Sequence, residues 1–155
     1  MTKLYIHSTD PSVAGKMKAD VYEKILARRK QTRELIAKTL LKADQITLEI
    51  GCGHGHFLTD YGIKNPKEIC VGIDVNRGRI FKAQKKAERA GLKNVHFIEC
   101  ESLEFLALLP EQIRIQHTWI LFPDPWPKKR HLKNRIVQTE FLEALGKHTL
   151  PEGRL

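Results

Sequence analysis

Four acidic residues stand at or just after the ends of apolar stretches, namely Glu49, Asp74, Glu101 and Asp124. If these stretches are parallel strands, their carboxyl ends meet at one edge of a sheet, where ligands of such sheets bind. A carboxylate there can accept hydrogen bonds from ribose hydroxyls or lie beside a positive charge. Taken singly, each acid could equally cap a helix or lie on the surface. Together they predict a binding site for a ligand with hydroxyls and positive charge.

A glycine-rich turn follows the first of these acids, in the segment Glu49-Ile50-Gly51-Cys52-Gly53-His54-Gly55. Glycines at alternate positions let the backbone turn sharply and approach a ligand closely. The dinucleotide fingerprint G-x-G-x-x-G would require a third glycine where His56 stands, which disfavours NAD. A plain tight turn is the alternative interpretation of this segment alone.

The cysteines and histidines of the chain predict neither a metal site nor a disulfide framework. Cys52, His54 and His56 form C-x-H-x-H, but neighbouring side chains diverge on an extended turn and no fourth ligand is evident. The three cysteines, Cys52, Cys70 and Cys100, are too widely spaced for a disulfide framework or a CxxC zinc site. We therefore expect no bound metal and reduced thiols.

A proline-braced acid precedes a strongly basic segment. Pro123, Pro125 and Pro127 fix three φ angles and hold Asp124 at the end of an apolar stretch. Residues 125–135 then carry five basic side chains and no acid, and residues 1–43 carry ten basic and four acidic ones. These two segments account for the whole excess behind the net charge of +9. Such segments commonly face polyphosphate, although a solvated helix face is the alternative for residues 1–43.

Strands and helices alternate along the rest of the chain, which predicts an α/β fold: a Rossmann-like, doubly wound, mostly parallel sheet with helices on both faces. We expect a basic helical segment at 1–43 and a second unit at 44–155. The first segment should contain two helices or one bent helix over 15–42, with candidate core contacts at Val21, Ile25, Leu35, Ile36, Leu40 and Leu41. Its predicted strands are 46–50, 69–75, 95–98 and 118–122, with a further strand beginning near residue 150. Its predicted helices begin at His56, Arg77 and Ser102, and a last helical stripe contains Ile136, Val137, Phe141, Leu142 and Leu145.

Two motifs carry a resemblance to a known family. The E-x-G-x-G-x-G turn resembles motif I of the Rossmann-like S-adenosylmethionine-dependent methyltransferases. Residues 122–131 closely match F-P-D-P-W-x-K-x-R-H, the signature of the bacterial TrmB-type tRNA (guanine-N7-)-methyltransferases. The resemblance runs from about Ile46 to the end of the chain.

This resemblance implies methyl transfer from S-adenosylmethionine to N7 of the guanine at position 46 in the tRNA variable loop. It implies that Asp124 is the catalytic residue and that Lys128 and Arg130 contact the substrate. Where the family commonly has Asp, this chain has Glu101. The implied cofactor contacts are Glu49, Gly51, Gly53, Gly55, Asp74, Glu101 and Asp124.

The chemistry agrees with these residue types. Guanine N7 has a free lone pair, so its attack on a sulfonium methyl group needs alignment and a nearby negative charge more than a general base. Asp124 can supply that charge while accepting hydrogen bonds from the guanine. Trp126 either stacks on a base or fills core space. We expect one phosphate-binding group at Lys128, Lys129, Arg130, Lys133 and Arg135, and a second at Arg28, Arg29, Lys30 and Arg33.

The last residues of the sequence lack motifs that the family has after its fifth strand. The sequence stops as a fifth strand begins, and the family's later substrate-binding Asp and T-x-x-E-type motif are absent. We expect residues 118–122 to form an exposed sheet edge, and therefore either a homodimer or further residues downstream. Another S-adenosylmethionine-dependent RNA methyltransferase and a catalytically dead RNA-binding fragment are the alternative functions. No long apolar run or signal-like start is present, so we expect a cytoplasmic protein with no membrane contact.

Overall fold

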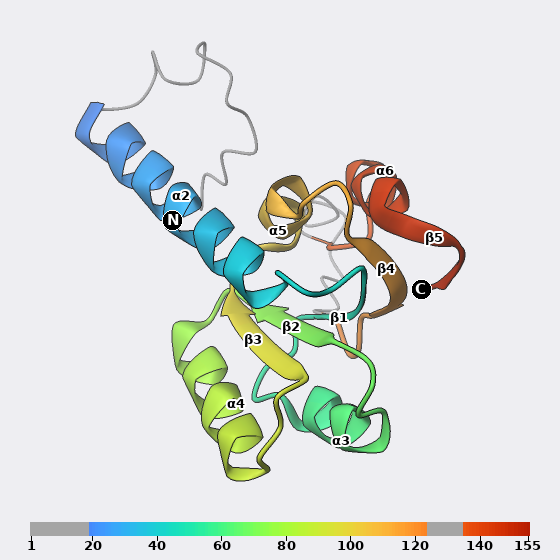
Figure 1. Cartoon of the computed structure of the whole chain (residues 1–155). Helices are drawn as coiled ribbons and strands as arrows, with labels where there is room; N and C mark the ends of the chain where they lie inside the picture. The colour runs from blue at the N-terminus through green and yellow to red at the C-terminus, as the bar shows by residue number, and fades with distance from the viewer. Residues whose placement is uncertain (1–18, 124–134) are drawn as a thin grey trace.

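A computed structural model describes residues 19–123 and 135–155 of the chain. Its centre is a five-stranded sheet with the order β3-β2-β1-β4-β5, in which every neighbouring pair is parallel (Figure 1). The predicted doubly wound α/β fold is therefore confirmed. The strands are β1 Gln45–Ile50, β2 Cys70–Asp74, β3 Val95–Glu99, β4 Arg114–Trp119 and β5 Thr149–Arg154.

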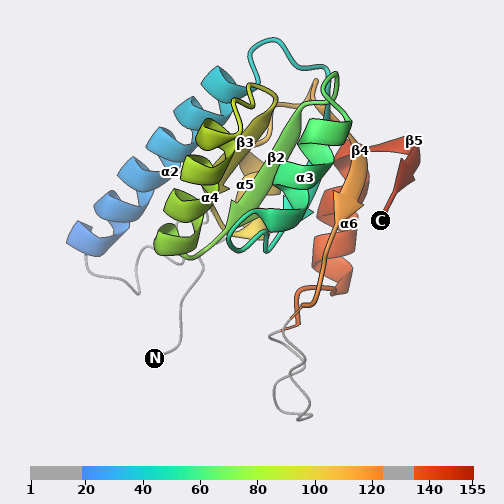
Figure 2. The same cartoon turned by 90° about the horizontal axis from the view of Figure 1, so that it is seen from below.

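Helices cover both faces of this sheet. On one face lie α2 (Ala19–Thr39), α5 (Ser102–Leu108) and α6 (Thr139–His148), and on the other lie α3 (His56–Lys64) and α4 (Arg77–Arg89) (Figures 1 and 2). Strand residues alternate between two apolar clusters, one on each face. In β1, Leu48 and Ile50 pack toward α5 and α6, which leaves Glu49 for the opposite face. No helix in the described ranges is long and apolar enough to cross a membrane.

The predicted α2 contacts were partly wrong. The described part of residues 15–42 forms a single helix followed by a turn, where two helices or a bent one were expected. Ile36 and Leu40 are buried in the main cluster, but Val21, Leu35 and Leu41 are exposed. The reason is that α2 meets the domain at the edge of the sheet beside β3, so most of its length has no partner on which to pack (Figure 2). The division of the chain at residue 43 stays a prediction.

The predicted stripe around α6 was also partly wrong. The helix begins at Thr139, so Ile136 and Val137 precede it, and Leu142 lies on its exposed side. Phe141 and Leu145, four residues apart, carry its buried face.

The predicted fourth strand, 118–122, was misplaced. β4 ends at Trp119 because its pairing with β1 runs from Gln45↔Arg114 to Glu49↔Trp119. β5 covers its other side, so β4 is not the exposed edge that the sequence suggested, and β3 and β5 are the edge strands. A homodimer stays a prediction, without the exposed β4 edge that motivated it.

Candidate functional site

The glycine turn between β1 and α3 has the conformation that its sequence predicts. Gly51, Gly53 and Gly55 have φ angles of +75°, +54° and +67°, which side chains disfavour. A Cβ atom at Gly55 would lie 2.5 Å from a ring carbon of Phe97, so this glycine also permits close packing. A Cβ atom at Gly51 or Gly53 would meet nothing within 4 Å. The first two glycines therefore leave open space beside the backbone, where a ligand fits.

Glu49 lies beneath this turn, next to the start of α3. Its side chain is only 4% exposed and accepts a hydrogen bond from the backbone N–H of Leu58, in the first turn of α3. Its Oε2 atom is buried without any hydrogen-bond partner. Burial raises the pKa of Glu49 from its ordinary value of 4.5 to about 7. A cationic ligand group would give this orphaned oxygen a partner.

Asp74, at the end of β2, is hydrogen-bonded to the glycine turn. Its carboxylate accepts hydrogen bonds from the backbone N–H of Gly53 at 3.1 Å and of Asn76 at 2.8 Å. Arg79 lies 3.8 Å away. The structure therefore brings Glu49, Asp74 and the glycine turn to the same end of the sheet, as the sequence predicts.

Glu101 follows β3 and caps α5. One carboxylate oxygen accepts from the backbone N–H of Glu104 at 3.0 Å, and the other accepts from the hydroxyl of Ser102 at 2.7 Å. This is the helix-capping role that the sequence left open for each acid. Its predicted contact with a cofactor stays a prediction.

A groove of about 880 Å³ opens beside these strand ends. Val75 and Arg77, just after Asp74, line it together with Glu101. Its opposite wall is α2, which contributes Arg28. Arg28 also binds Oε2 of Glu104 at 2.8 Å, so this member of the predicted phosphate-binding group already has an ion-pair partner.

An aromatic cluster at the end of β4 was not predicted. Trp119 packs edge-on against Phe57 of α3, with ring centroids 5.3 Å apart, and lies 6.1 Å from the ring of Tyr61. Trp119 pairs in register with Glu49, and its Nε1 atom is buried without a hydrogen-bond partner. The signal that could have found it was a tryptophan at the end of a strand neighbouring the glycine turn.

The thiols and imidazoles have ordinary structural surroundings. All three cysteines are free and buried, as predicted. Burial raises the pKa of Cys70 and of Cys100 to about 12, and raises that of Cys52 as well. Nδ1 of His56 lies 2.7 Å from Nζ of Lys86. Over residues 19–123 and 135–155, no group of three or more His, Cys, Asp or Glu side chains is arranged to hold a metal ion.

The predicted residues Asp124, Lys128 and Arg130 lie outside the described residues. Just before them, Phe122 has a φ of +51° and is 98% exposed. This is a rare conformation for a large side chain.

Comparisons with known proteins agree with this geometry. The family Methyltransf_4, described as "Putative methyltransferase", matches residues 43–155. A "tRNA (guanine-N(7)-)-methyltransferase" of Thermotoga maritima is 39% identical over 102 residues, which are 66% of this chain and 33% of the relative. One of Pseudomonas putida is 36% identical over 107 residues, which are 69% of this chain and 45% of the relative. This chain thus spans between a third and a half of the length of these relatives.

Solved structures share the fold. PKMT2 from Rickettsia typhi in complex with AdoHcy superposes with a TM-score of 0.55 at 25% identity, covering 74% of this chain and 20% of that one. A SAM-dependent methyltransferase from Aquifex aeolicus superposes with a TM-score of 0.52 at 24% identity, covering 77% of this chain and 58% of that one. The sheet described above is therefore the Rossmann-like methyltransferase fold.

Proposed function

The chain belongs to the Methyltransf_4 family, and on that premise we propose that it acts in methyl transfer from S-adenosylmethionine to N7 of a guanine in tRNA. The predicted resemblance to TrmB-type methyltransferases is confirmed by the relatives of that name. The position in the tRNA is proposed as 46, in the variable loop. The proposal includes a cytoplasmic location, where the tRNA substrate is found.

The observation that carries this proposal is the buried, unpartnered Oε2 atom of Glu49 beside the open side of Gly51 and Gly53. Carboxylate acceptors at this end of the sheet fit S-adenosylmethionine, whose amino-acid end has a positively charged ammonium group. Glu49 would bind that ammonium group, Asp74 the ribose hydroxyls and Glu101 the adenine amino group. When bound, the cofactor supplies a methyl group activated by its positively charged sulfur.

The substrate side of the proposal rests on the sequence signature at residues 122–131. Asp124 would hold the guanine and offset the positive charge that develops on the purine, which is the chief demand of the transition state. Lys128 and Arg130 would bind the phosphates beside that base. No proton has to leave N7, so these residues orient and stabilise rather than act as a base.

The first experiment measures cofactor binding and then product formation. Titration calorimetry of S-adenosylmethionine should show binding to the wild-type chain and at least tenfold weaker binding to Glu49→Gln. A transfer assay on an unmodified tRNA transcript, followed by mapping of the methylated atom, should then identify N7 of guanine 46. Methylation of another atom would favour a different RNA methyltransferase, and the absence of cofactor binding would favour an RNA-binding fragment.

The second experiment concerns the proposed catalytic residue. Asp124→Ala should abolish methyl transfer while leaving the fold and most of the cofactor affinity unchanged. Asp60→Ala, which removes an exposed carboxylate from α3, is the matched control and should leave transfer intact. Near-normal turnover by Asp124→Ala would rule out the assigned role.

A further inference from the structure

Helix α4 has a charge that helix stability explains only in its last turn, where the dipole favours Lys86 and Arg89. Its thirteen residues carry six Lys and Arg side chains against one acid, Glu88. Basic residues stand in its first turn, where the helix dipole favours acids, and no acid is present there. Arg77 has no ion-pair partner within the described ranges. The basic residues of the first turn therefore fit an anionic partner better than they fit the helix dipole.

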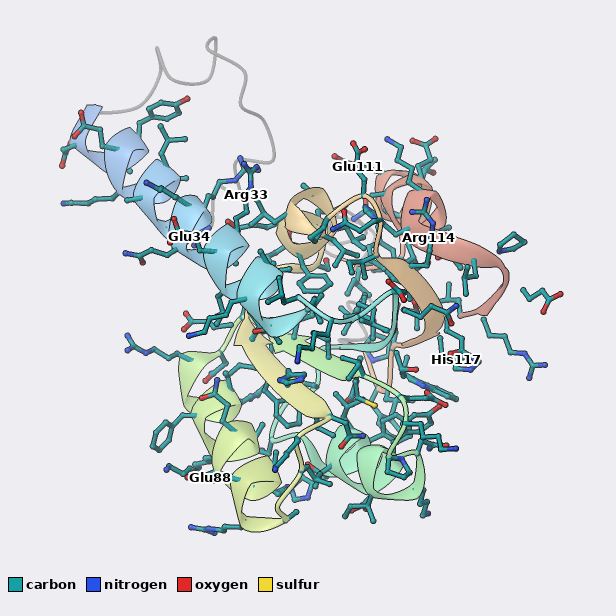
Figure 3. The ribbon with its side chains drawn as sticks, viewed as in Figure 1. Arg33, Glu34, Glu88, Glu111, Arg114 and His117 are labelled. Atoms are coloured by element: carbon teal, nitrogen blue, oxygen red, sulfur yellow. The ribbon has the colours of Figure 1, made fainter. Side chains whose placement is uncertain are left out.

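The exposed side of α4 presents these charges in a row around an aromatic ring. Arg77, Phe81, Lys85 and Arg89 are spaced by four residues, so they lie one above the other over about 18 Å. Phe81 is 59% exposed, although its ring is large and apolar. The only acid of the helix, Glu88, lies toward the end of α4 (Figure 3). It binds Lys85 at 2.8 Å in an exposed ion pair. Such a pair exchanges readily for another partner.

This row, which we call the α4 row, begins at the end of the sheet that carries the proposed cofactor site. Arg77 is the third residue after Asp74, and both Arg77 and Phe81 line the groove that faces α2. Figure 1 shows α2 and α4 on opposite sides of the edge strand β3. Across the groove stands Arg28, whose guanidinium is held by Glu104.

Carboxylates on the floor of the groove limit where a polyanion can lie. Glu99, at the end of edge strand β3, is exposed there, and Glu101 and Glu104 line the same floor. Phosphates are repelled from this floor and attracted to the α4 row, whereas carboxylates can accept hydrogen bonds from the amino groups of bases. A groove with one arginine on each wall, an aromatic ring and carboxylate acceptors fits an unpaired nucleotide strand better than a duplex.

We propose that the α4 row, with Lys82 beside it, binds the backbone of an unpaired segment of the tRNA substrate, with one base stacked on Phe81. This inference rests on the proposed function, because it assigns a second contact to the same substrate. Arg77, Lys82 and Arg89 neutralise phosphates, and the ring of Phe81 provides a sequence-tolerant stacking surface.

The test compares two triple variants with equal charge change. In Arg77→Gln/Lys82→Gln/Arg89→Gln the proposed contacts are removed. The control, Lys42→Gln/Lys64→Gln/Lys67→Gln, removes three exposed lysines at the opposite, amino-terminal end of the strands. Binding of the full chain to a fluorescent, unmodified tRNA transcript is measured by anisotropy between about 50 and 200 mM salt. Cofactor titration and thermal unfolding of each variant confirm that the fold is retained.

The α4 variant should lower the slope of log K against log salt by about 2 units, because each lost phosphate contact on a single strand contributes roughly 0.7. The control should keep the wild-type slope. Phe81→Ala should weaken binding about tenfold with an unchanged slope, since stacking releases no counterions.

Equal slopes for the α4 variant and the control would overturn the inference, as would wild-type affinity in Phe81→Ala. Both results leave the proposed function intact, because that function is judged by methyl transfer to guanine. Conversely, methylation of an atom other than N7 would overturn the proposed function, while the difference between the two triple variants would still support the α4 row.

Discussion

Cofactor affinity should depend steeply on pH because Glu49, the acid that we propose to bind the cofactor's ammonium group, is buried. Glu49 faces the first turn of α3, and Cys52 is an ionisable neighbour of it. Moving its pKa from 4.5 to about 7 corresponds to a cost of about 3 kcal/mol for ionising the carboxyl in the folded chain. A ligand ammonium group offsets this cost only when Glu49 is ionised, so binding requires the loss of its proton.

The expected titration follows from this linkage. Affinity for S-adenosylmethionine should rise nearly tenfold from pH 5 to pH 6 and about fivefold from pH 6 to pH 7, and then level off before the ligand's own amino group loses its proton near pH 8. Calorimetry in two buffers of different ionisation enthalpy should show close to one proton released at pH 6. Glu49→Gln should bind weakly with a flat profile below pH 7. The reasoning is refuted if the wild-type chain and Glu49→Gln share the same pH profile.

The same group should govern stability without ligand. Because the folded-state pKa of Glu49 lies above its unfolded-state value, the folded chain binds more protons between about pH 4.5 and 7. The free energy of unfolding should therefore fall as the pH rises through this window, by up to about 3 kcal/mol from this residue. Urea unfolding at pH 5 and 7.5 measures the loss, which should vanish in Glu49→Gln and persist in Glu143→Gln, an exposed control on α6.

Three further outcomes test the packing around the site. Gly55→Ala should lower the free energy of unfolding by about 2 to 4 kcal/mol, because it combines a clash with a left-handed φ, whereas Gly53→Ala should cost only about 1 kcal/mol; similar urea midpoints would contradict this. A double-mutant cycle on Arg28→Ala and Glu104→Gln should give a coupling of about 1 kcal/mol, since the arginine is largely exposed, and a coupling of zero would show that the pair does not form. The three buried thiols should react with a disulfide reagent at pH 8 far more slowly in the folded chain than in urea, and equal rates would show that they are accessible.

The sequence was sufficient for features that local chemistry decides. Alternating apolar and amphipathic stretches predicted the parallel sheet and its order of elements. Gly91, which follows α4, has a φ of +68°, the left-handed conformation that glycine favours after a helix end. The turn at Gly51, Gly53 and Gly55 and the placement of Asp74 follow equally from residue type and spacing.

Features that depend on partners could not be predicted in this way. The apolar run that ends at Phe122 looks like a strand, but β4 ends at Trp119 because pairing with β1 sets its limits. In α2 the neighbours Leu35 and Ile36 are equally apolar, and only Ile36 reaches the core. The lack of a hydrogen-bond partner for Oε2 of Glu49 also depends on where α3 begins relative to β1, which cannot be predicted from local sequence.

Electrostatics at this end of the sheet would separate the two ligands that we propose, which have opposite charges. The acids Glu49 and Asp74 are buried, so their field acts mainly on a ligand that enters the turn, and a compact cation gains most there. The α4 row is exposed and acts through solvent, where only a polyanion that meets several cations at once gains substantially. Residues 44–124 together have a net charge of −1, although α4 within this segment has five more basic than acidic residues. The net charge of the segment therefore does not reveal the charge of α4. Because burial and exposure divide these roles, the proposed cationic methyl donor and the proposed anionic acceptor would bind at one end of the sheet without either charge set cancelling the other.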